Sequence, residues 1–517
     1  MDKCRWHCLS NKGSVAIIVW YAIYALCYGT SFYTMLTTNK EVLLIVFIPT
    51  IIMYSLLGLI GEIFVGRQRL INFSIWVQWI AMIMSSLIAA LEFAYDFPQW
   101  LKVFLVAVPS VIQLIGLSAF QVTAVQFGID RIQAAPSKHL TAFIFWYFCM
   151  ELVPNSMLHF TTTMLSSYVH IIHVELGIRL GSCLLCVVLL SFILFVKSCF
   201  MSNWFVGDPE GGTACTNKGN RSYYEQNPYS LVYRVIKFAL KHKHPLQRSA
   251  LTYWEDKLPS RIDLGKNKYG GPFTSEEVDN VKMLLQLITV LVSLLGIFFV
   301  SFSVNVDMYH QVVSVPNSSV LVDGLSSVLM IGVYFLLFLL LFLPCCHKNL
   351  PKMLKRIWIG AIVTVASAVS MLLIGPVTTE YTENDEISLC EAALNPYLLL
   401  IPAILCTGSY MFLTMSLFEF IIAQSPQNMK GMLIGLYYTF RFGLGGLFVL
   451  ADYNVFKRYY PTHNKVLSCP TAHFIEIIFF GVLSLLVYTI VACKYKPRER
   501  DEVVNVHIFA EEYYAKI

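Results

Sequence analysis

The chain has 517 residues, of which 57% are hydrophobic and 13% charged, with a mean hydropathy of +0.63 and a formal net charge of +5. A soluble globular chain is normally about a quarter charged, so this composition excludes a single soluble core. The modest net charge gives no support for nucleic-acid binding, and no Cys/His spacing or phosphate loop indicates a metal or a cofactor.

Apolar runs of about 20 residues recur along the chain, which is the length that a helix needs to cross a bilayer core of ~30 Å. Backbone amides in lipid must bond internally, so these runs are expected to be helices. We therefore predict an all-α membrane protein with twelve transmembrane helices. In chain order they are 14–36, 42–64, 70–92, 101–126, 139–160, 172–196, 283–304, 322–344, 357–376, 395–423, 432–452 and 472–493.

Basic residues decide the predicted orientation, because cytoplasmic loops carry an excess of Lys and Arg. The loops that share a side with the two termini are the more basic set, and the opposite loops are more acidic. Both termini are therefore expected in the cytosol. The membrane that holds the protein is expected to be the plasma membrane or an endolysosomal membrane. His170, His173, Glu175 and Arg179, near the outer end of the sixth span, are expected to form a solvated cluster.

A long polar segment separates six predicted helices from six. The predicted divisions are an N-terminal half (1–197), a cytosolic linker (198–282), a C-terminal half (283–493) and a cytosolic tail (494–517). Within the linker, an apolar stripe at Leu231, Val235, Phe238 and Leu240 among basic residues predicts an amphipathic helix. Thr274 and Glu277 have the spacing of a capping box, which predicts a helix start.

Two features of the predicted outer loops depend on this orientation. Asn317 begins an Asn-Ser-Ser sequon and is a candidate glycosylation site. Cys390 and Cys469 also lie in outer loops, where an oxidising environment permits a disulfide. Two unpaired thiols are the alternative.

Four motifs resemble those of a transporter superfamily and of one family within it. The stretch GEIFVGRQRLI, Gly61 to Ile71, resembles the inner-loop signature of the major facilitator superfamily. Phe127 to Asp130 (FGID), Phe143 to Phe148 (FIFWYF) and Glu419 to Lys430 (EFIIAQSPQNMK) resemble, in order, motifs of its proton-coupled oligopeptide transporter (peptide/nitrate transporter) family. The resemblance implies two six-helix halves around a central site, transport of di- or tripeptides or related solutes, and proton coupling.

The chain departs from that family at its ionisable residues. The family's first helix carries Glu-x-x-Glu-Arg, whereas the aligned positions here hold Trp20, Ile23 and Tyr24. The family's fourth-helix lysine aligns with Gln121. Proton coupling is therefore left open, and an uncoupled facilitator is an alternative.

Glu419 is the most unusual residue, because it lies deep in an apolar segment. It precedes Lys430 by eleven residues, which predicts a depth of ~16 Å, near the midplane. A charge there costs at least ~2.5 kcal/mol, so we expect it to face a cavity or a partner. Arg441 follows Lys430 by eleven residues and is the candidate partner. Glu419 is either the anchor of a substrate ammonium, as the resemblance implies, or half of a static ion pair.

Further candidates complete the predicted site. Substrate contacts are assigned to Glu419, Gln121, Tyr28, Tyr24, Trp146 and Glu151. Charge contacts that close an inner gate are assigned to Asp130, Arg131, Glu62, Arg67 and Arg69, beside the candidate pair of Arg441. The alternative for the aromatic residues is ordinary packing, and for Glu151 a structural role on the outer side.

The sequence thus predicts a secondary transporter, or solute carrier, for small organic solutes, embedded in a lipid bilayer and not an enzyme. A non-transporting receptor or sensor on the same scaffold is the rival hypothesis. A membrane enzyme has little support, because no nucleophile and base stand at usable spacing. The sequence gives no indication of the oligomeric state.

Overall fold

A computed structural model gives the arrangement of the chain. It describes residues 12–38, 40–95, 97–130, 137–168, 172–200, 228–242, 259–314, 329–337, 351–377, 398, 400–426, 429–456 and 471–495. Within these residues every regular element is a helix, and the only β-type contact is an isolated bridge between Lys266 and Phe273. The all-α prediction is therefore confirmed.

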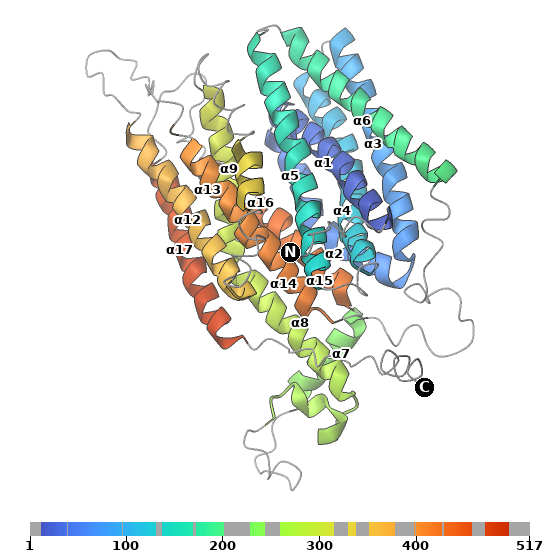
Figure 1. Ribbon diagram of the computed structural model, residues 1–517, viewed down its shortest axis with the longest axis vertical. Coiled ribbons are helices and arrows are strands. Elements are labelled where there is room, and N and C mark those ends of the chain that lie inside the picture. Colours follow the sequence, from blue (N-terminus) through green and yellow to red (C-terminus); the bar gives the residue numbers. More distant parts are fainter. Residues whose placement is uncertain are drawn as a thin grey trace, which may run out of the picture.

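Six helices form a first bundle, drawn in blue to green in Figure 1. They are α1 (Lys12–Thr38), α2 (Lys40–Ile63), α3 (Arg67–Ala94), α4 (Gln99–Asp130), α5 (Ser137–Tyr168) and α6 (Ile172–Phe200). The closest packing within this bundle joins α3 to α4 and α6, α2 to α4, and α1 to α5.

The second bundle is drawn in yellow-green to red in Figure 1 and contains several interrupted helices. It comprises α8 (Ser275–Ser293), α9 (Leu295–Ser314), α12 (Met353–Val377), α13 (Leu400–Ser409), η6 (Tyr410–Met415), α14 (Ser416–Gln424), α15 (Lys430–Tyr438), η8 (Thr439–Leu444), α16 (Gly445–Phe456) and α17 (Thr471–Lys494). The segments η6 and η8 are π-helical turns inside otherwise α-helical spans. Such π-bulges are rare and occur often at functional sites.

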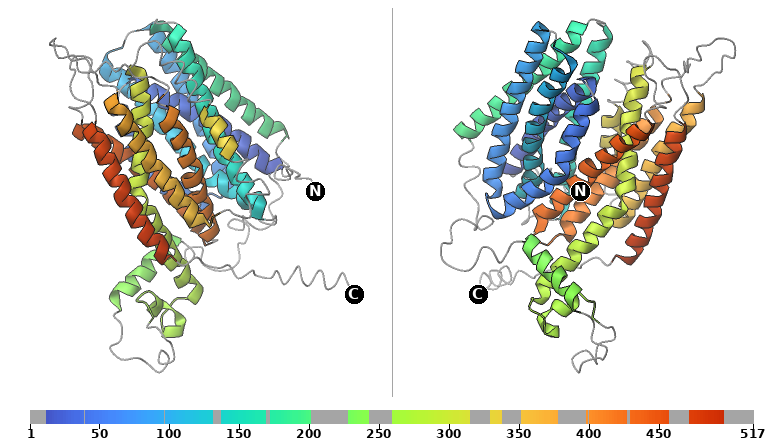
Figure 2. Two further views of the ribbon diagram at one scale, coloured as in Figure 1. Left: turned by 60° about the vertical axis from the view of Figure 1, so that its left-hand side comes forward. Right: turned by 180° about the vertical axis from the view of Figure 1, so that it is seen from behind.

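The two bundles lie side by side and touch through a few helices (Figures 1 and 2). Helix α2 packs against α15 and η8, and α5 packs against η6. Glycine makes the first contact close, since a Cβ on Gly58 would lie 2.6 Å from the Gly431 carbonyl oxygen. A Cβ on Gly435 would lie 2.7 Å from the Tyr54 carbonyl oxygen. Small residues at such positions let membrane helices approach closely.

Seven helices in the described residues are long and apolar enough to span a membrane, and an eighth is added if α8 and α9, bent by 40°, form one span. Of the other four predicted spans, two overlap shorter apolar helices, Val15–Ser31 and Ile48–Gly61. The remaining two, 139–160 and 322–344, overlap α5 and the helical residues 329–337. The chain is thus an integral multi-pass membrane protein. The full number of spans, the side on which the termini lie and the division at 197, 282 and 493 stay predictions.

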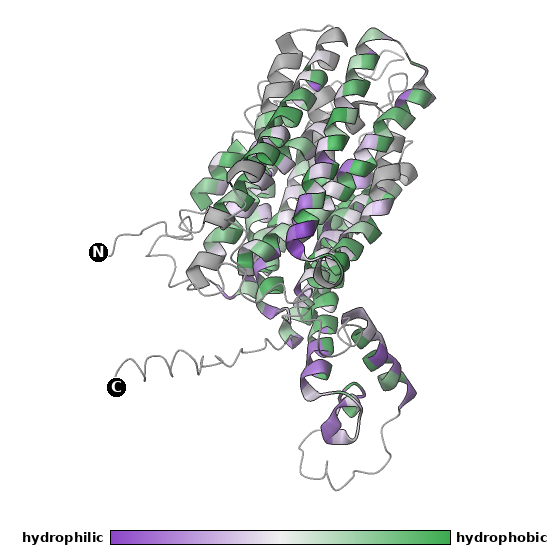
Figure 3. Cartoon of the chain, turned by 90° about the vertical axis from the view of Figure 1, so that its right-hand side faces the viewer, coloured by the Kyte–Doolittle hydropathy of each residue, from purple (hydrophilic) through white to green (hydrophobic). Residues whose placement is uncertain are grey.

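Apolar residues, drawn in green in Figure 3, predominate along the helices of the two bundles, and many of their side chains are exposed. Leu373, Val188 and Phe479 are each more than 60% exposed, which is expected of surfaces that face lipid. Arg179 differs from its prediction: it is buried and pairs with Glu92 at 3.1 Å, joining α6 to α3. The predicted solvated position of Arg179 is therefore wrong. Its buried charge is stabilised by the Glu92 carboxylate on the neighbouring helix.

A small polar unit lies below the bundles, where Figure 3 shows hydrophilic residues in purple. It contains α7 (Pro228–Lys241), η3 (Asp263–Gly265), η4 (Asn267–Tyr269) and the start of α8. The amphipathic helix is confirmed as α7, with Val235 and Ala239 buried. Leu240 does not belong to its buried stripe, since its side chain is 75% exposed.

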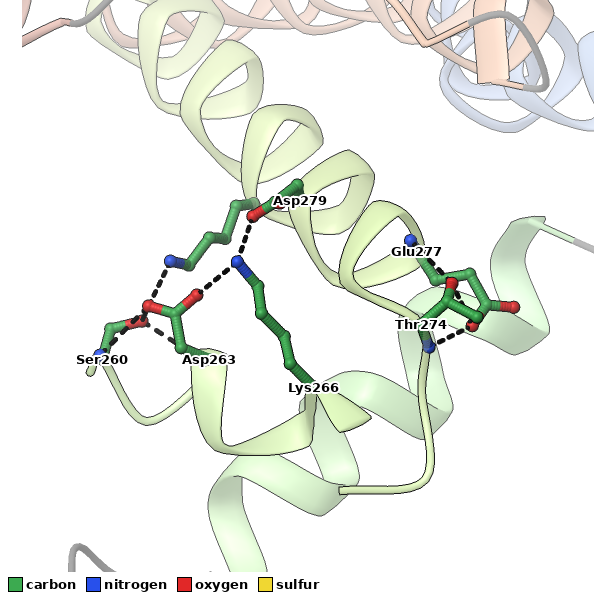
Figure 4. A network of polar contacts seen from close by, with 7 residues as sticks. Ser260, Asp263, Lys266, Thr274, Glu277 and Asp279 are labelled. Atoms are coloured by element: carbon green, nitrogen blue, oxygen red, sulfur yellow. Dashed lines mark hydrogen bonds and ion pairs between the residues drawn. The ribbon is translucent and has the colours of Figure 1, made fainter. Parts of the chain in front are cut away.

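Two polar networks hold this unit together, and Figure 4 shows both. The predicted capping box is confirmed: Thr274 accepts from the Glu277 backbone N–H, and the Thr274 N–H donates to the Glu277 carboxylate. Asp263 pairs with Lys282 and, at 3.1 Å, with Lys266. Burial raises the pKa of Asp263, but hydrogen bonds from Lys282, Ser260 and Lys266 outweigh it and lower that pKa to about 2.

Candidate functional site

An ion pair joins the two bundles at mid-depth. Glu151 lies near the middle of α5, and Arg441 lies in η8 of the second bundle. The Arg441 Nη2 is 3.6 Å from the Glu151 Oε1, and the two side chains are only 14% and 13% exposed. Tyr21 of α1 donates its hydroxyl to the Glu151 Oε2 at 2.9 Å. The charge of each partner is thus compensated inside the bundle.

Hydrogen bonds extend from this ion pair into the first bundle. Tyr54 of α2 donates to the Gln121 Oε1 at 2.8 Å, and the Gln121 Nε2 donates to the Tyr21 hydroxyl at 3.2 Å. Tyr21 in turn donates to Glu151. A chain of polar contacts therefore links α2, α4, α1 and α5. Within it, Tyr21 alone connects Gln121 to the Glu151 carboxylate.

Aromatic rings surround the same pair. The guanidinium of Arg441 lies 5.2 Å from the centroid of Tyr410 and 4.7 Å from that of Phe442, within cation–π range. It also donates to the Tyr437 hydroxyl at 3.3 Å. On the first bundle, Tyr147 stacks on Tyr21 with centroids 3.9 Å apart. These rings exclude much of the water, so charges among them interact more strongly than in solution.

Glu419 pairs with another arginine than the one expected. Its Oε2 lies 3.1 Å from the Arg356 Nη2 at the start of α12. Its Oε1 accepts a hydrogen bond of 2.8 Å from the Thr141 hydroxyl of α5. The carboxylate therefore joins two helices of its own bundle and also contacts the first bundle.

The predicted pairing of Glu419 with Arg441 is wrong, and the local backbone explains the error. Helix α14 ends at Gln424, so the residues between it and Lys430 do not continue the helical rise. Glu419 is only five residues before that end, ~7.5 Å along the axis. Arg441, by contrast, is eleven residues into a helix that begins at Lys430, ~16 Å. The two residues therefore stand at different depths.

The aromatic candidates lie in different surroundings. Tyr28 interacts electrostatically with both Glu151 and Arg441. Tyr24 is turned into the first bundle, where its hydroxyl lies 3.0 Å from the Ser74 Oγ and its ring stacks on Phe120. Trp146 packs edge-to-face on Phe145 and on Phe335, the latter in the helical segment 329–337. Tyr28 thus lies near the central pair, whereas Tyr24 has the packing role that was its alternative.

The gate candidates are described only in part. Arg67 and Arg69 lie in the first turn of α3, directly after Gly66, whose φ of 82° favours glycine. The side chains of Glu62 and Asp130 lie outside the described residues, as do Arg131, Asn317, Cys390 and Cys469.

Several residues of the site escaped the sequence interpretation. Arg356 directly precedes the predicted span 357–376, in a polar stretch that was assigned to a loop. Because α12 begins earlier, at Met353, hydropathy carried no signal of the place of Arg356 in the helix. Tyr437 precedes Arg441 by four residues, the spacing of neighbours on one helix face. Thr141 carried no signal, because a threonine hydroxyl in an apolar helix usually bonds the backbone of that helix. Tyr21 carried none, because aromatic residues in membrane helices mostly serve in packing.

Known structures share this fold, although no protein-family model matches the sequence. The POT family transporter PepTSo superposes with a TM-score of 0.58 at 15% identity, covering 92% of this chain and 97% of that chain. An auto-inhibited POT family peptide transporter gives 0.58 at 14%, covering 94% and 98%. A POT family transporter in complex with 5-aminolevulinic acid gives 0.55 at 11%, covering 93% and 95%.

A bacterial homologue of the iron transporter ferroportin also matches, with a TM-score of 0.53 at 12% identity over 93% of this chain and 99% of that chain. The chain therefore has the two-bundle, major-facilitator-like fold of these transporters. Since proteins with different cargoes share it, the fold leaves the substrate undetermined.

Proposed function

We propose that this chain is a divergent relative of the POT family that carries small organic solutes across the membrane by alternating access. One observation carries the proposal: the Glu151–Arg441 pair joins the two bundles at mid-depth, among aromatic rings. Intramembrane charges are costly and mark substrate or ion pathways. Binding between two helical bundles near the midplane is also the usual plan of secondary transporters.

The substrate class follows from the two charges. A solute with an ammonium and a carboxylate group complements Glu151 and Arg441, and it replaces their contact with two new ion pairs. Tyr28, Tyr410 and Phe442 would contact its apolar part. Di- or tripeptides and related amino-acid-like solutes have this chemistry, and a structural neighbour was solved with 5-aminolevulinic acid. We therefore place Glu151, Arg441, Gln121 and Tyr28 at the substrate site.

Alternating access requires the bundles to separate on one side at a time. The Thr141–Glu419 hydrogen bond and the Glu151–Arg441 ion pair are ten residues apart on α5, ~15 Å along its axis. The two contacts therefore lie at different depths, and a rocking motion loosens one before the other. Glu419 then holds the two bundles together through Thr141, with its charge balanced by Arg356, and is not the substrate anchor. Glu62, Arg67, Arg69, Asp130 and Arg131 stay proposed gate residues.

Proton coupling through these carboxylates has little support. Glu151 and Glu419 each have an arginine partner, so the charge of each carboxylate is already compensated by a neighbouring cation. The family's other ionisable positions are occupied by Trp20, Ile23, Tyr24 and Gln121. We therefore favour transport driven by the gradient of the solute itself.

The test is uptake by proteoliposomes that contain the purified full-length chain, using a panel of di- and tripeptides and amino acids. Saturable uptake that Arg441→Gln abolishes is expected. Flat uptake across the panel would reject this substrate class, and binding without flux would favour the receptor hypothesis. Equal rates with and without an inward pH gradient are expected for an uncoupled facilitator, whereas gradient-driven accumulation would overturn that part.

A further inference from the structure

A second candidate ligand site lies in the polar unit, away from the central pair. It is an open pocket of about 510 Å³ between α7 and the segment that leads into α8. This volume is within the range of about 300–1,000 Å³ of small-molecule sites. The lining residues are Arg234, Lys237, Phe238 and Lys241 of α7, with Pro272, Phe273 and Glu277 opposite.

The lining of this pocket is strongly cationic. Arg234, Lys237 and Lys241 are three and four residues apart, so they share one face of α7. One carboxylate, that of Glu277, faces them, and it is engaged in the capping box by the Thr274 N–H and hydroxyl, each at 2.9 Å. Within the described residues, three basic side chains and one carboxylate line the pocket, which favours an anionic ligand that carries more than one charge.

The walls of the pocket are held in place before any ligand binds. Phe238 contacts Phe273 edge-to-face with centroids 6.0 Å apart, and Val235 of the same helix is fully buried. The capping box fixes the start of α8 on the other side. The protein therefore loses little conformational entropy when a ligand binds.

The helix that lines the pocket, α7, also contacts the first bundle. Tyr229 at the start of α7 donates to the Ser55 carbonyl oxygen of α2 at 3.3 Å. Two apolar side chains beside Lys237 are largely exposed, Tyr233 at 62% and Leu240 at 75%. Exposed apolar residues next to basic ones are typical of helices that rest on an anionic membrane surface.

We propose that this pocket binds a small anion bearing two or more phosphate groups, such as a phosphorylated inositol. Phosphate oxygens accept the charge-assisted hydrogen bonds that Arg234, Lys237 and Lys241 can donate. The same chemistry is available from a lipid headgroup and from the free inositol phosphate. The site is independent of the solute pathway, so its test needs no transport.

The experiment uses the full-length chain in nanodiscs of neutral phosphatidylcholine and fluorescent inositol trisphosphate as the probe. Saturable binding to the native chain is expected, and Lys237→Gln with Lys241→Gln should weaken it about tenfold or more. The matched control is Arg261→Gln with Lys268→Gln, which removes the same charge from exposed positions of the same unit outside the pocket. Lys237→Arg with Lys241→Arg should retain binding.

The outcomes separate a built site from general charge attraction. Equal losses in the pocket variant and its control, or no saturable binding to the native chain, would overturn the proposal. Nanodiscs that contain phosphatidylinositol bisphosphate distinguish the two sources of the ligand. Reduced probe binding relative to phosphatidylserine nanodiscs of equal charge identifies the headgroup as the ligand, and unchanged binding identifies the soluble phosphate.

Discussion

Neutralising one partner of the Glu151–Arg441 pair should lower the unfolding temperature of the protein more than neutralising both. At 3.6 Å and an effective dielectric constant of ~20, two unit charges attract by roughly 4–5 kcal/mol. Water that reaches the partly exposed side chains reduces this, so we expect a coupling free energy of about 1.5–3 kcal/mol. That corresponds to roughly a ten- to hundredfold change in a rate or an equilibrium.

A double-mutant cycle measures this coupling. The variants are Glu151→Gln, Arg441→Gln and the combination, each compared by apparent unfolding temperature in detergent and by initial uptake rate in proteoliposomes. Each single variant leaves an uncompensated charge in the bundle, whereas the double variant leaves none. The double variant should therefore unfold at a higher temperature than either single variant, although its uptake should stay low because both proposed substrate contacts are gone.

The matched control is the Glu92–Arg179 pair, which is also buried, with a contact of 3.1 Å, but joins α3 and α6 within one bundle. Glu92→Gln should lower the unfolding temperature while leaving uptake per folded molecule within about twofold, because no contact between the bundles is lost. Strictly additive effects of Glu151→Gln and Arg441→Gln on the unfolding temperature, with a coupling below ~0.5 kcal/mol, would refute the reasoning.

Three further predictions concern other contacts. Thr141→Val removes the hydrogen bond to Glu419 and should change the uptake rate by about fivefold, ~1 kcal/mol, whereas Thr141→Ser should not; equal effects of both would contradict a role for the hydroxyl. Arg356→Gln leaves the Glu419 carboxylate without its charge partner and should lower the unfolding temperature, an effect that adding Glu419→Gln should partly reverse; a further fall would contradict the pairing. Asp263 has a folded pKa of about 2, below the ordinary value of 3.8, so its stabilisation is complete above pH ~4 and is lost as the pH falls through ~2. Pepsin cleavage within 259–282 should therefore increase as the pH is lowered from ~4 to ~2, and in Asp263→Asn it should be fast already at pH ~4. Identical pH profiles of the native chain and Asp263→Asn would reject this assignment.

The sequence by itself determined the helical membrane character, because apolar runs of bilayer length leave the backbone no other way to satisfy its hydrogen bonds. It also located the start of α8, since a capping box is a local interaction of Thr274 with Glu277. The amphipathic α7 was equally local, except that exposed Leu240 was assigned to the buried stripe.

Only the tertiary structure decided which polar groups meet. Hydropathy reports how far a residue lies along a helix and says nothing of the rotation of its side chain about the axis. It therefore could not predict the ion-pair partners of Glu419 and Arg441. The break after Gln424 and the π-turn that contains Arg441 changed both depth and rotation. Thr141 and Glu419 are 278 positions apart and are joined only by the packing of two bundles. Such contacts are a property of helix packing, which no single helix encodes.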